Sequence, residues 1–446
     1  MFENIIEQGA VCQLRDDILS VKNAPSMLFF GPLYSGKGSA ALEAARVFSC
    51  EQDAAWKCSC PSCERHRLLL HDDMLVLGRR SFASEIEACK SAFLGNPSNQ
   101  NIKLLFFRSI RKLIIRFSPV VMDDDPKFSK ISSILSSLDE KLNEFWDNAQ
   151  EVSPNNSKTD DSALEKKCAS LIKDAFALEN EGINANIPVG HIRSASYWCR
   201  LAPGGKQKTL IIENAEKMKS EAHNSLLKLL EEPPSSVNII LTTQRKEALI
   251  QTILSRLRPY RFLKRSREGE REIIRRVFQS ANESGLSEYL DSFTPQSSEK
   301  MYPLAAWFIV SFARIASLSC KKNAADVPAF LNILGGRYAP TADATGFEKC
   351  LKSSSLIKTV ISHSENFKDA SFSRFMKICL DMISSVMQTS EDAEIIRYCD
   401  LFKKYINEAA SSVDVLNINE AAALEALFFK LKKAVVQKLS LRGLYG

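Results

Sequence analysis

Three features are scarce in this 446-residue chain, and each absence narrows what the protein can be. It carries only 17 glycines and 16 prolines, well below the usual combined share of about 12%, so long helices should outweigh turns. The richest apolar stretch, Leu304 to Phe312, falls far short of the roughly 20 residues that span a bilayer. The N-terminus, which begins Met1-Phe2-Glu3, lacks the basic start and apolar core of a signal peptide. We therefore expect a cytoplasmic protein with no membrane partner.

Charge of a single sign is scarce as well. Lysine and arginine number 59 against 53 aspartates and glutamates, and the net charge of +6 permits a nucleic-acid-facing surface without arguing for one. Hydrophobic residues make up 45% and charged residues 25%, the usual balance of a globular protein, and the length predicts about three domains. Without an export signal, the twelve cysteines are expected to be thiols or metal ligands rather than disulfides.

Short apolar runs alternate with helical stretches along two parts of the chain. The runs that we expect to be strands are 26–30, 74–77, 210–212 and 237–241. An alanine-rich helix is expected over 39–48, and another begins near Ser220 and ends at Pro233, because proline lacks the amide donor of a helix. This alternation predicts an α/β fold in which helices cover both faces of a parallel sheet.

Two other parts of the chain break this rhythm. Residues 79–186 contain a basic amphipathic stretch (103–117) and a polar loop that we expect to be mobile near Pro154–Asp161. We interpret them as an insertion of mostly helical character. From Lys264 onward, apolar positions recur at helical spacing, so the C-terminal part should be all-α.

A phosphate-binding loop is predicted between the first apolar run and the helix that follows it. Residues 31–39 read GPLYSGKGS, in which Gly31 and Gly36 let the backbone approach an anion closely and Lys37 adds positive charge. The serine or threonine that would hold magnesium after the lysine is replaced by Gly38, and Ser39 is the residue that can substitute for it. The alternative is a glycine-rich turn without a ligand.

The acidic strand end that magnesium chemistry requires is incomplete. Glu213 follows the third apolar run, but Asn214 stands where a second acid is expected, and an amide cannot take a proton from water. Glu216 lies one turn further on and is interpreted as a solvated helix residue. These departures predict a chain without efficient ATP hydrolysis of its own.

A cluster of cysteines predicts a structural zinc site in a small knuckle, residues 50–63. The four candidate ligands are Cys50, Cys58, Cys60 and Cys63. Four thiolates close a tetrahedral site and leave no position open for water. His66 and His71 are alternates that we interpret as surface or helix residues. The other cysteines are expected to be small buried hydrophobic residues, at 12, 89, 168, 199, 320, 350, 379 and 399.

At this point the motifs together resemble a known family. The segments that carry the resemblance are the phosphate loop with its cysteine knuckle, the opening 2–8 (FENIIEQ), 226–234 (LLKLLEEPP) and 252–256 (TILSR). They resemble the bacterial clamp-loader AAA+ subunits of DNA polymerase III, namely the gamma/tau ATPase and its relative the delta-prime subunit. The resemblance covers 1–78 and 187–263, and leaves out 79–186.

The departures decide which subunit the chain resembles more. Gamma/tau keeps a Lys-Thr loop ending and an Asp-Glu pair, whereas delta-prime subunits degrade both but retain a Ser-Arg-Cys segment. Here that segment reads Ser255-Arg256-Leu257. The resemblance implies that Arg256 reaches into a neighbouring subunit's ATP site, where a guanidinium stabilises phosphoryl charge. Its alternative is a surface or salt-bridging arginine. Thr243 (or Thr242) corresponds to the sensor position.

The resemblance also implies a domain plan and a function. The plan is an AAA+ α/β P-loop domain over 1–263, a helical lid over 264–315 and an all-α collar over 316–446. We expect a delta-prime-like stator that works with gamma/tau and delta subunits, the sliding clamp and primed DNA. The alternative is a gamma/tau-type motor, in which Ser39 rescues magnesium binding and Glu213 or Glu216 serves catalysis. ATP and magnesium binding are left open.

Two basic stretches have two interpretations each. The first contains Lys103, Arg108, Arg111, Lys112 and Arg116. It is either a helix that binds nucleic acid, which would make the chain a zinc-knuckle adaptor, or a packed helix with a solvated basic rim, which we favour. The second, at the C-terminus, has the same ambiguity and contains Lys430, Lys432, Lys433, Lys438 and Arg442.

Overall fold

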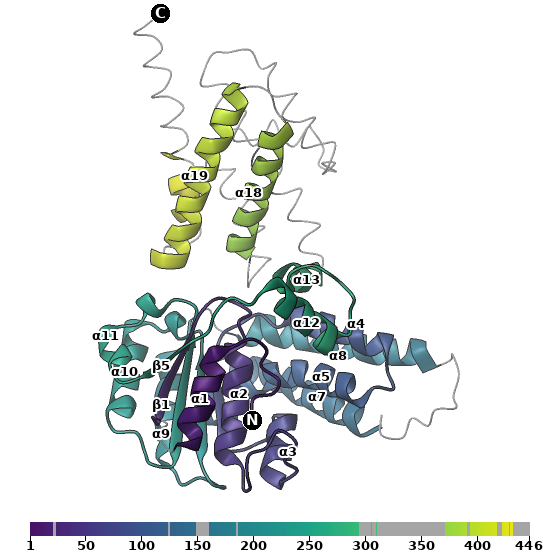
Figure 1. Ribbon diagram of the computed structural model, residues 1–446, viewed down its shortest axis with the longest axis vertical. Coiled ribbons are helices and arrows are strands. Elements are labelled where there is room, and N and C mark those ends of the chain that lie inside the picture. Colours follow the sequence, from purple (N-terminus) through teal and green to yellow (C-terminus); the bar gives the residue numbers. More distant parts are fainter. Residues whose placement is uncertain are drawn as a thin grey trace, which may run out of the picture. The chain divides into compact units, whose positions relative to one another are not determined.

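The computed structural model divides into two compact units, Met1–Thr294 and Pro295–Gly446, each of which is described by itself (Figure 1). The residues that the structure describes are 1–20, 24–123, 125–148, 160–183, 186–293, 305, 309, 371–389, 393–416, 422–427 and 429–430.

A five-stranded parallel sheet forms the centre of the first unit, which confirms the predicted α/β class. Its strands, in spatial order, are β2 (Met74–Gly78), β3 (Lys208–Glu213), β4 (Val237–Thr243), β1 (Ser26–Phe30) and β5 (Arg258–Arg261). The apolar runs predicted four of them. The fifth escaped prediction because β5 reads Arg-Pro-Tyr-Arg, with a single apolar side chain pointing inward. That residue, Tyr260, is fully buried and donates its hydroxyl to Asp17 at 2.8 Å.

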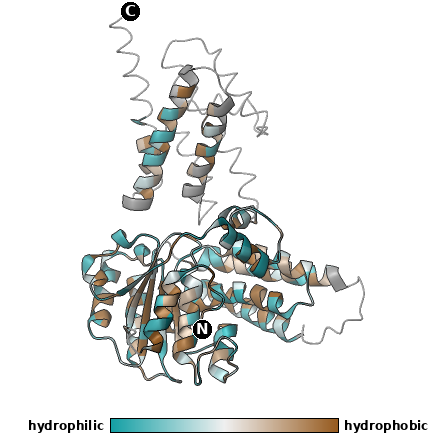
Figure 2. Ribbon diagram, viewed as in Figure 1, coloured by the Kyte–Doolittle hydropathy of each residue, from teal (hydrophilic) through white to brown (hydrophobic). Residues whose placement is uncertain are grey.

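Side chains alternate between the two faces of the sheet, and each face packs against its own helices. Leu28 and Leu241 belong to one hydrophobic cluster, and Phe29 and Ile240 belong to the other. The strands are accordingly among the most apolar elements of the ribbon (Figure 2). The second cluster includes α1 (Gly9–Leu19) and α2 (Lys37–Ser49), and the first includes α9 (Val189–Arg200) and α10 (Ser220–Glu231).

The described helices of this unit outside residues 79–186 also include α3 (Pro61–Leu68), α11 (Gln251–Leu254), α12 (Arg267–Phe278) and α13 (Leu286–Ser292). Its 3-10 turns are η1 (Ile115–Phe117), η2 (Ala215–Lys217) and η3 (Lys246–Ala248). α10 ends at Glu231, just before the two prolines, as proline chemistry requires.

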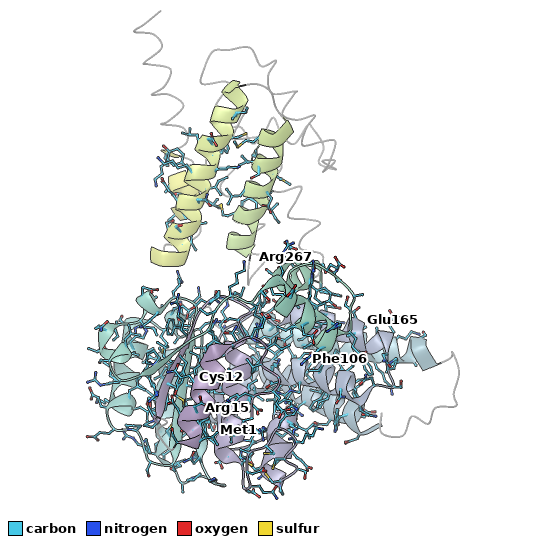
Figure 3. All side chains as sticks on the ribbon, in the orientation of Figure 1. Met1, Cys12, Arg15, Phe106, Glu165 and Arg267 are labelled. Atoms are coloured by element: carbon cyan, nitrogen blue, oxygen red, sulfur yellow. The ribbon has the colours of Figure 1, made fainter. Side chains whose placement is uncertain are left out.

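Residues 79–186 are helical throughout most of their described length and pack around aromatic side chains. Their helices are α4 (Ala83–Gly95), α5 (Gln100–Ile114), α6 (Pro119–Met122), α7 (Phe128–Asn148) and α8 (Asp160–Gly182). Phe93, Phe106 and Phe145 form a buried trio with ring centroids 5.5–5.8 Å apart. Phe106 lies in the midst of this segment (Figure 3). The loop expected to be mobile lies outside the described residues from 154 to 159.

The solvated basic rim that we favoured for α5 is wrong, because its cations are turned inward. Lys103 is 1% exposed and donates to the carbonyl of Trp146 at 2.7 Å. Arg111 is 3% exposed and bonds to Asp139 and Asn143 on α7. Buried cations with protein partners are not available to a phosphate backbone, so the competing nucleic-acid interpretation of this helix fails as well.

In the second unit the structure describes mainly two helices, α18 (Ser371–Thr389) and α19 (Ala393–Leu416), which pack against each other. Their all-α character agrees with the predicted fold class. Of the C-terminal basic run, Lys430 bonds to Glu408 at 2.9 Å, and the other four residues lie outside the described ones. Among the helices that the structure describes, none has the length and hydropathy to cross a membrane.

Candidate nucleotide-binding and metal sites

The predicted phosphate loop joins β1 to α2, as the sequence indicated. Gly36 is the residue before the helix and adopts φ +94°, a left-handed conformation that favours glycine. A Cβ on Gly36 would also lie 2.5 Å from Nη2 of Arg265. Ser39, the residue proposed to replace the missing hydroxyl, sits exposed in the first turn of α2.

Lys37 is buried and points back onto its own loop. Its Nζ donates to the carbonyl oxygens of Gly31 at 2.7 Å and Pro32 at 2.5 Å, and to Ser35 Oγ at 3.2 Å. Burial lowers the pKa of Lys37 to about 8, despite the nearby charges of Glu216 and Glu213. The amine that would contact phosphate is therefore engaged by the loop itself.

Arg265 closes the loop from the other side and was not found from the sequence. It follows β5, donates from Nε to the carbonyl of Ile6 at 3.1 Å, and bonds through Nη1 to the carbonyl of Tyr34. It is 9% exposed, and burial lowers its pKa. No motif marks this arginine, because only the fold brings residue 265 beside residues 6 and 34.

Glu213, at the end of β3, is buried in a cluster of positive charge. Its Oε2 pairs with Arg116 and lies 3.9 Å from Nε of Arg80. Burial alone would raise the pKa of Glu213, but the charges of Arg116 and Arg80 outweigh it and hold the pKa below its usual value. Oε1 lies 2.7 Å from the position that a Cβ on Gly38 would occupy. The carboxylate of Glu213 therefore occupies space that a side chain at position 38 would need.

The residues next to Glu213 are occupied by structural bonds. Asn214 has φ +52° and donates from Nδ2 to the carbonyl of Arg79, and its amide donates to Thr242 Oγ1 at 3.3 Å. Glu216 is 7% exposed and accepts the amide of Gln244, so its interpretation as a solvated residue is wrong. It is drawn inward because η2 turns back toward the end of β4.

The sensor-like threonine is buried, and its side-chain hydroxyl forms hydrogen bonds within the turn that follows β4. Thr243 Oγ1 donates to the carbonyl of Arg245 at 3.1 Å and accepts that residue's amide at 3.0 Å. In this arrangement the hydroxyl shapes the loop after β4.

Arg256 lies at the end of α11 and remains partly exposed. Its Nη2 lies 2.8 Å from Oε1 of Glu231 at the end of α10, and its Nη1 donates to the carbonyl of Thr252 at 2.7 Å. The side chain is 33% exposed. Arg256 thus forms a salt bridge within the chain and still keeps the exposed surface that a residue needs in order to reach a neighbouring subunit.

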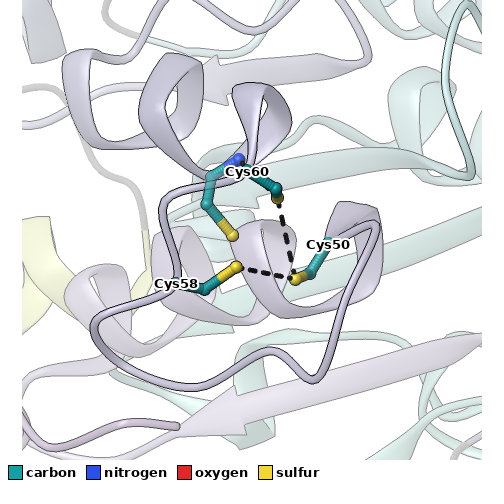
Figure 4. Close-up of side chains that lie close together, drawn as sticks. Cys50, Cys58 and Cys60 are labelled. Carbon is teal, nitrogen blue, oxygen red and sulfur yellow. Dashed lines mark hydrogen bonds between the residues drawn. The ribbon is translucent and has the colours of Figure 1, made fainter.

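The four predicted cysteine ligands converge into one buried cluster. Figure 4 labels three of them, Cys50, Cys58 and Cys60. Their sulfur atoms all lie within 4.8 Å of one another, and Cys50 is 3.6 Å from Cys58 and 3.9 Å from Cys60. Zinc bonded to sulfur at about 2.3 Å in a tetrahedron separates the sulfurs by about 3.8 Å. The donor set and its spacing therefore fit a closed structural metal site.

Hydrogen-bond donors surround the sulfur atoms of the cluster. Arg46, on α2, donates to Cys63 Sγ at 2.9 Å, and the amide of Gln52 donates to Cys50 Sγ at 3.3 Å. Pro61 opens α3 directly after Cys60, whose sulfur accepts the Cys63 amide at 3.5 Å. Burial opposes ionisation of Cys60, but the backbone donors of Glu51 and Cys63 outweigh it and lower its pKa to about 7. Burial instead raises the pKa of Cys63, despite the nearby charge of Arg46.

Two interpretations near the cluster need correction. His66 and His71 are both buried and stack at 4.1 Å between ring centroids, so neither is a surface residue. His66 is a helix residue of α3, as the other half of the interpretation had it, whereas His71 lies after that helix. His71 accepts the Asp73 amide and contacts Ser62 Oγ at 3.0 Å, and burial lowers its pKa. Cys12 is exposed on α1, against the prediction of burial. The other described cysteines outside the cluster are buried, namely those at 89, 168, 199, 379 and 399; positions 320 and 350 lie outside the described residues.

In this arrangement, the residues of the phosphate loop and of the end of β3 do not fit a magnesium–nucleotide complex. Position 38 offers no hydroxyl, and Glu213 is already neutralised by arginines. Lys37 and Arg265 are bonded to the loop carbonyls. No catalytic step through a metal-bound nucleotide follows from this geometry.

Comparison with known proteins supports the family suggested by the motifs. A family model described as DNA polymerase III, delta subunit, matches residues 148–266. The DNA polymerase III subunit delta-prime of Pseudomonas aeruginosa is 36% identical over 95 residues, which are 21% of this chain and 29% of that one. A crystal structure of a DNA polymerase III gamma subunit-related protein from Thermotoga maritima covers 56% of this chain and 81% of that chain at 18% identity. Its TM-score of 0.28 is too low to support an argument.

The parallel sheet and the loop between β1 and α2 define an α/β protein with the strand–loop–helix order of a P-loop domain. Within that class, the sequence matches confirm the predicted resemblance to DNA polymerase III clamp-loader subunits. The chain spans less than a third of the length of the Pseudomonas relative. The family match begins at residue 148 and includes α8, so the resemblance extends into the segment that we interpreted as an insertion.

Proposed function

We propose that the chain is a delta-prime-like stator of a DNA polymerase III clamp loader. It assembles with gamma/tau and delta subunits, braces them through its AAA+ domain, lid and collar, and helps place a sliding clamp on primed DNA. The observation that carries this proposal is the internal neutralisation of Glu213 by Arg116, beside a residue 38 without a hydroxyl. A site so arranged supports a chain that does not hydrolyse ATP itself.

Arg256 is the residue that we propose acts on ATP, in a neighbouring subunit. Its side chain is accessible, and its partner Glu231 is a half-exposed carboxylate. An exposed ion pair of this kind contributes about 1 kcal/mol or less, so a phosphoryl group next door can compete for the guanidinium.

Zinc is the metal that we propose for the cysteine cluster. Cys50, Cys58, Cys60 and Cys63 offer four sulfur donors and no open position, which favours zinc in a structural role over a catalytic one. Bound there, zinc would tie the end of α2 to the start of α3.

The second candidate is a gamma/tau-type motor. The observation in its favour is the complete strand–loop–helix frame around Lys37, with Ser39 exposed in the first turn of α2. Against it stand Gly38, Asn214 and the paired Glu213.

The test is reconstitution of the full chain with the gamma/tau and delta subunits of the same organism. We expect co-purification, no ATP turnover by the isolated chain, and a higher turnover of the complex when the chain is present. Turnover by the isolated chain that depends on magnesium and is lost in Lys37→Ala would establish the motor instead. Failure to co-purify would reject the clamp-loader role.

A further inference from the structure

The arginine that pairs with Glu213 comes from the middle of the segment 79–186. Arg116 lies in η1, directly after α5, and its Nη1 also bonds to the carbonyl of Lys112 in the preceding turn. Its Nη2 carries the ion pair with Glu213 Oε2. The two side chains are 5% and 8% exposed, so the ion pair is shielded from water on both sides.

Arg116 is held in place by further buried groups. Its guanidinium lies 4.6 Å from the ring centroid of Phe82, and the guanidinium of Arg80 lies at the same distance from that ring. Phe82 is fully buried, and its amide donates to Glu179 Oε1 on α8 at 2.9 Å. Two arginines therefore share one aromatic ring and one carboxylate, an arrangement fixed by several elements of the segment.

The same network continues outward through a second carboxylate. Glu85, on α4, bonds to Arg80 and to Lys112 of α5. Burial by itself would raise the pKa of Glu85, but these two cations outweigh it and lower the pKa to about 2. Three cations and two carboxylates thus form one cluster that joins β3 to α4 and α5.

We propose that the segment 79–186 supplies a built-in counter-ion to the acidic end of β3, with Arg116 and Arg80 in the place where this class of fold holds a divalent cation. Arg116 keeps Glu213 ionised and directed over the first turn of α2. The charge at the end of β3 is therefore balanced by side chains of this chain itself. In this inference the segment is part of the site and completes it.

Physical chemistry favours a fixed cation over a recruited one at this position. A magnesium ion that approached Glu213 would have to displace the buried guanidinium of Arg116, which would then remain without a carboxylate, whereas Arg80 would keep its bond to Glu85. Removing one partner of a buried ion pair is far more costly than replacing both, because the remaining charge has no compensation. Gly38 adds no ligand that could offset this cost.

The counter-ion pair lies at the same site as the proposed function, and its biological meaning rests on that proposed function. The two can nevertheless fail separately. A chain with coupled Arg116 and Glu213 that does not co-purify with clamp-loader subunits would reject the proposed function alone. A chain that co-purifies but shows no coupling would reject this inference alone.

The experiment is a double-mutant cycle on the full chain, with Arg116→Gln, Glu213→Gln and the double variant. The measurement is the melting temperature with and without magnesium chloride and a slowly hydrolysed ATP analogue. We expect each single variant to melt lower by on the order of 10 °C, and the double variant to recover much of that loss. Wild type and the double variant should not respond to magnesium, whereas folded Arg116→Gln should be stabilised by it.

A second ion pair nearby, between Arg111 of α5 and Asp139 of α7, provides the control. Arg111 is equally buried but pairs with Asp139, away from Glu213. Arg111→Gln should destabilise the chain without creating any response to magnesium. If Arg116→Gln does not fold, Glu213→Gln is compared with the double variant, which should be at least as stable, and Arg116→Lys, which keeps the charge, should not respond to magnesium. Additive losses in the cycle, or a wild-type melting temperature that rises with magnesium or its nucleotide complex, would overturn the inference.

Discussion

Nη2 of Arg256 lies 2.8 Å from Oε1 of Glu231, so two segments that the sequence singled out separately meet in the structure. Glu231 closes α10 in the LLKLLEEPP segment, and Arg256 follows α11 in the TILSR segment. Both side chains remain partly exposed. An arginine that serves a neighbouring subunit would exchange this partner for a phosphate when the complex forms.

We therefore predict that Arg256→Ala lowers the free energy of unfolding of the isolated chain by no more than about 1 kcal/mol, because the ion pair is exposed. In the assembled complex, ATP turnover at the site that it serves should fall by roughly an order of magnitude or more. The measurements are urea unfolding of the chain and steady-state ATP turnover of the complex. Arg275→Ala is the control, since Arg275 is also an exposed, paired arginine. Equal turnover in the two variants would reject the finger role.

Lys37 gives a prediction about pH. Its folded-state pKa is about 8, whereas the unfolded lysine titrates near 10.5. Between these values the unfolded chain holds a proton that the folded chain has released, so the free energy of unfolding should rise as pH rises from 8 to 10.5. The gain for this one group is on the order of 3 kcal/mol.

Lys37→Met isolates that contribution, because methionine has a similar length and no charge. Urea unfolding at a series of pH values should show a flatter profile above pH 8 for Lys37→Met than for wild type. Lys264→Met is the control, because Lys264 is an exposed lysine that directly precedes Arg265 in the sequence; this variant should keep the wild-type slope. Parallel profiles for wild type and Lys37→Met would contradict the predicted shift.

Gly38→Ala tests the packing of Glu213 against α2. In an open helix this substitution stabilises by about 1 kcal/mol. Here the new Cβ would lie 2.7 Å from Glu213 Oε1, and the carboxylate is held by Arg116, so we expect destabilisation by about 1–3 kcal/mol. Gly190→Ala in α9 is the matched control, because a Cβ there has nothing within 4 Å. Calorimetric melting measures both; a Gly38→Ala variant as stable as Gly190→Ala would show that Glu213 is free to move.

Metal analysis tests the cysteine cluster. We expect one equivalent of zinc per chain, lost in the double variant Cys60→Ser/Cys63→Ser, because two of the four sulfur donors are then gone. The same double variant should unfold at a lower temperature than wild type. Cys89→Ser/Cys199→Ser, which changes two buried thiols outside the cluster, should retain the metal. Wild-type protein that folds fully without any metal would contradict the prediction.

The sequence predicted the local features of the site and missed the contacts that join distant segments. Strand–loop–helix order placed Lys37 correctly, and the spacing of cysteines placed four donors together, because both signals are local. Arg265 carries no local signal at all. Arg116 was visible only as one cation of a basic stretch, and periodicity cannot show which carboxylate a cation will meet.

Two errors have the same physical origin. Glu216 and the cations of α5 were interpreted as solvated, because a charged side chain usually prefers water. The tertiary structure supplies each with a partner, and a paired charge can be buried. Whether a charged residue can be buried therefore depends on its partner as well as on the residue itself. A single sequence does not show which residue that partner is.

The amino-acid sequence by itself determined the α/β class, the phosphate-type loop without its hydroxyl, the cysteine cluster and the helical C-terminal part. Each of these follows from residue type and spacing over a few positions. Only the tertiary structure decided that Glu213 faces Arg116 and that Arg265 closes the loop. Those pairings join residues about a hundred or more positions apart, and their energy depends on burial and distance, which exist only once the chain has folded.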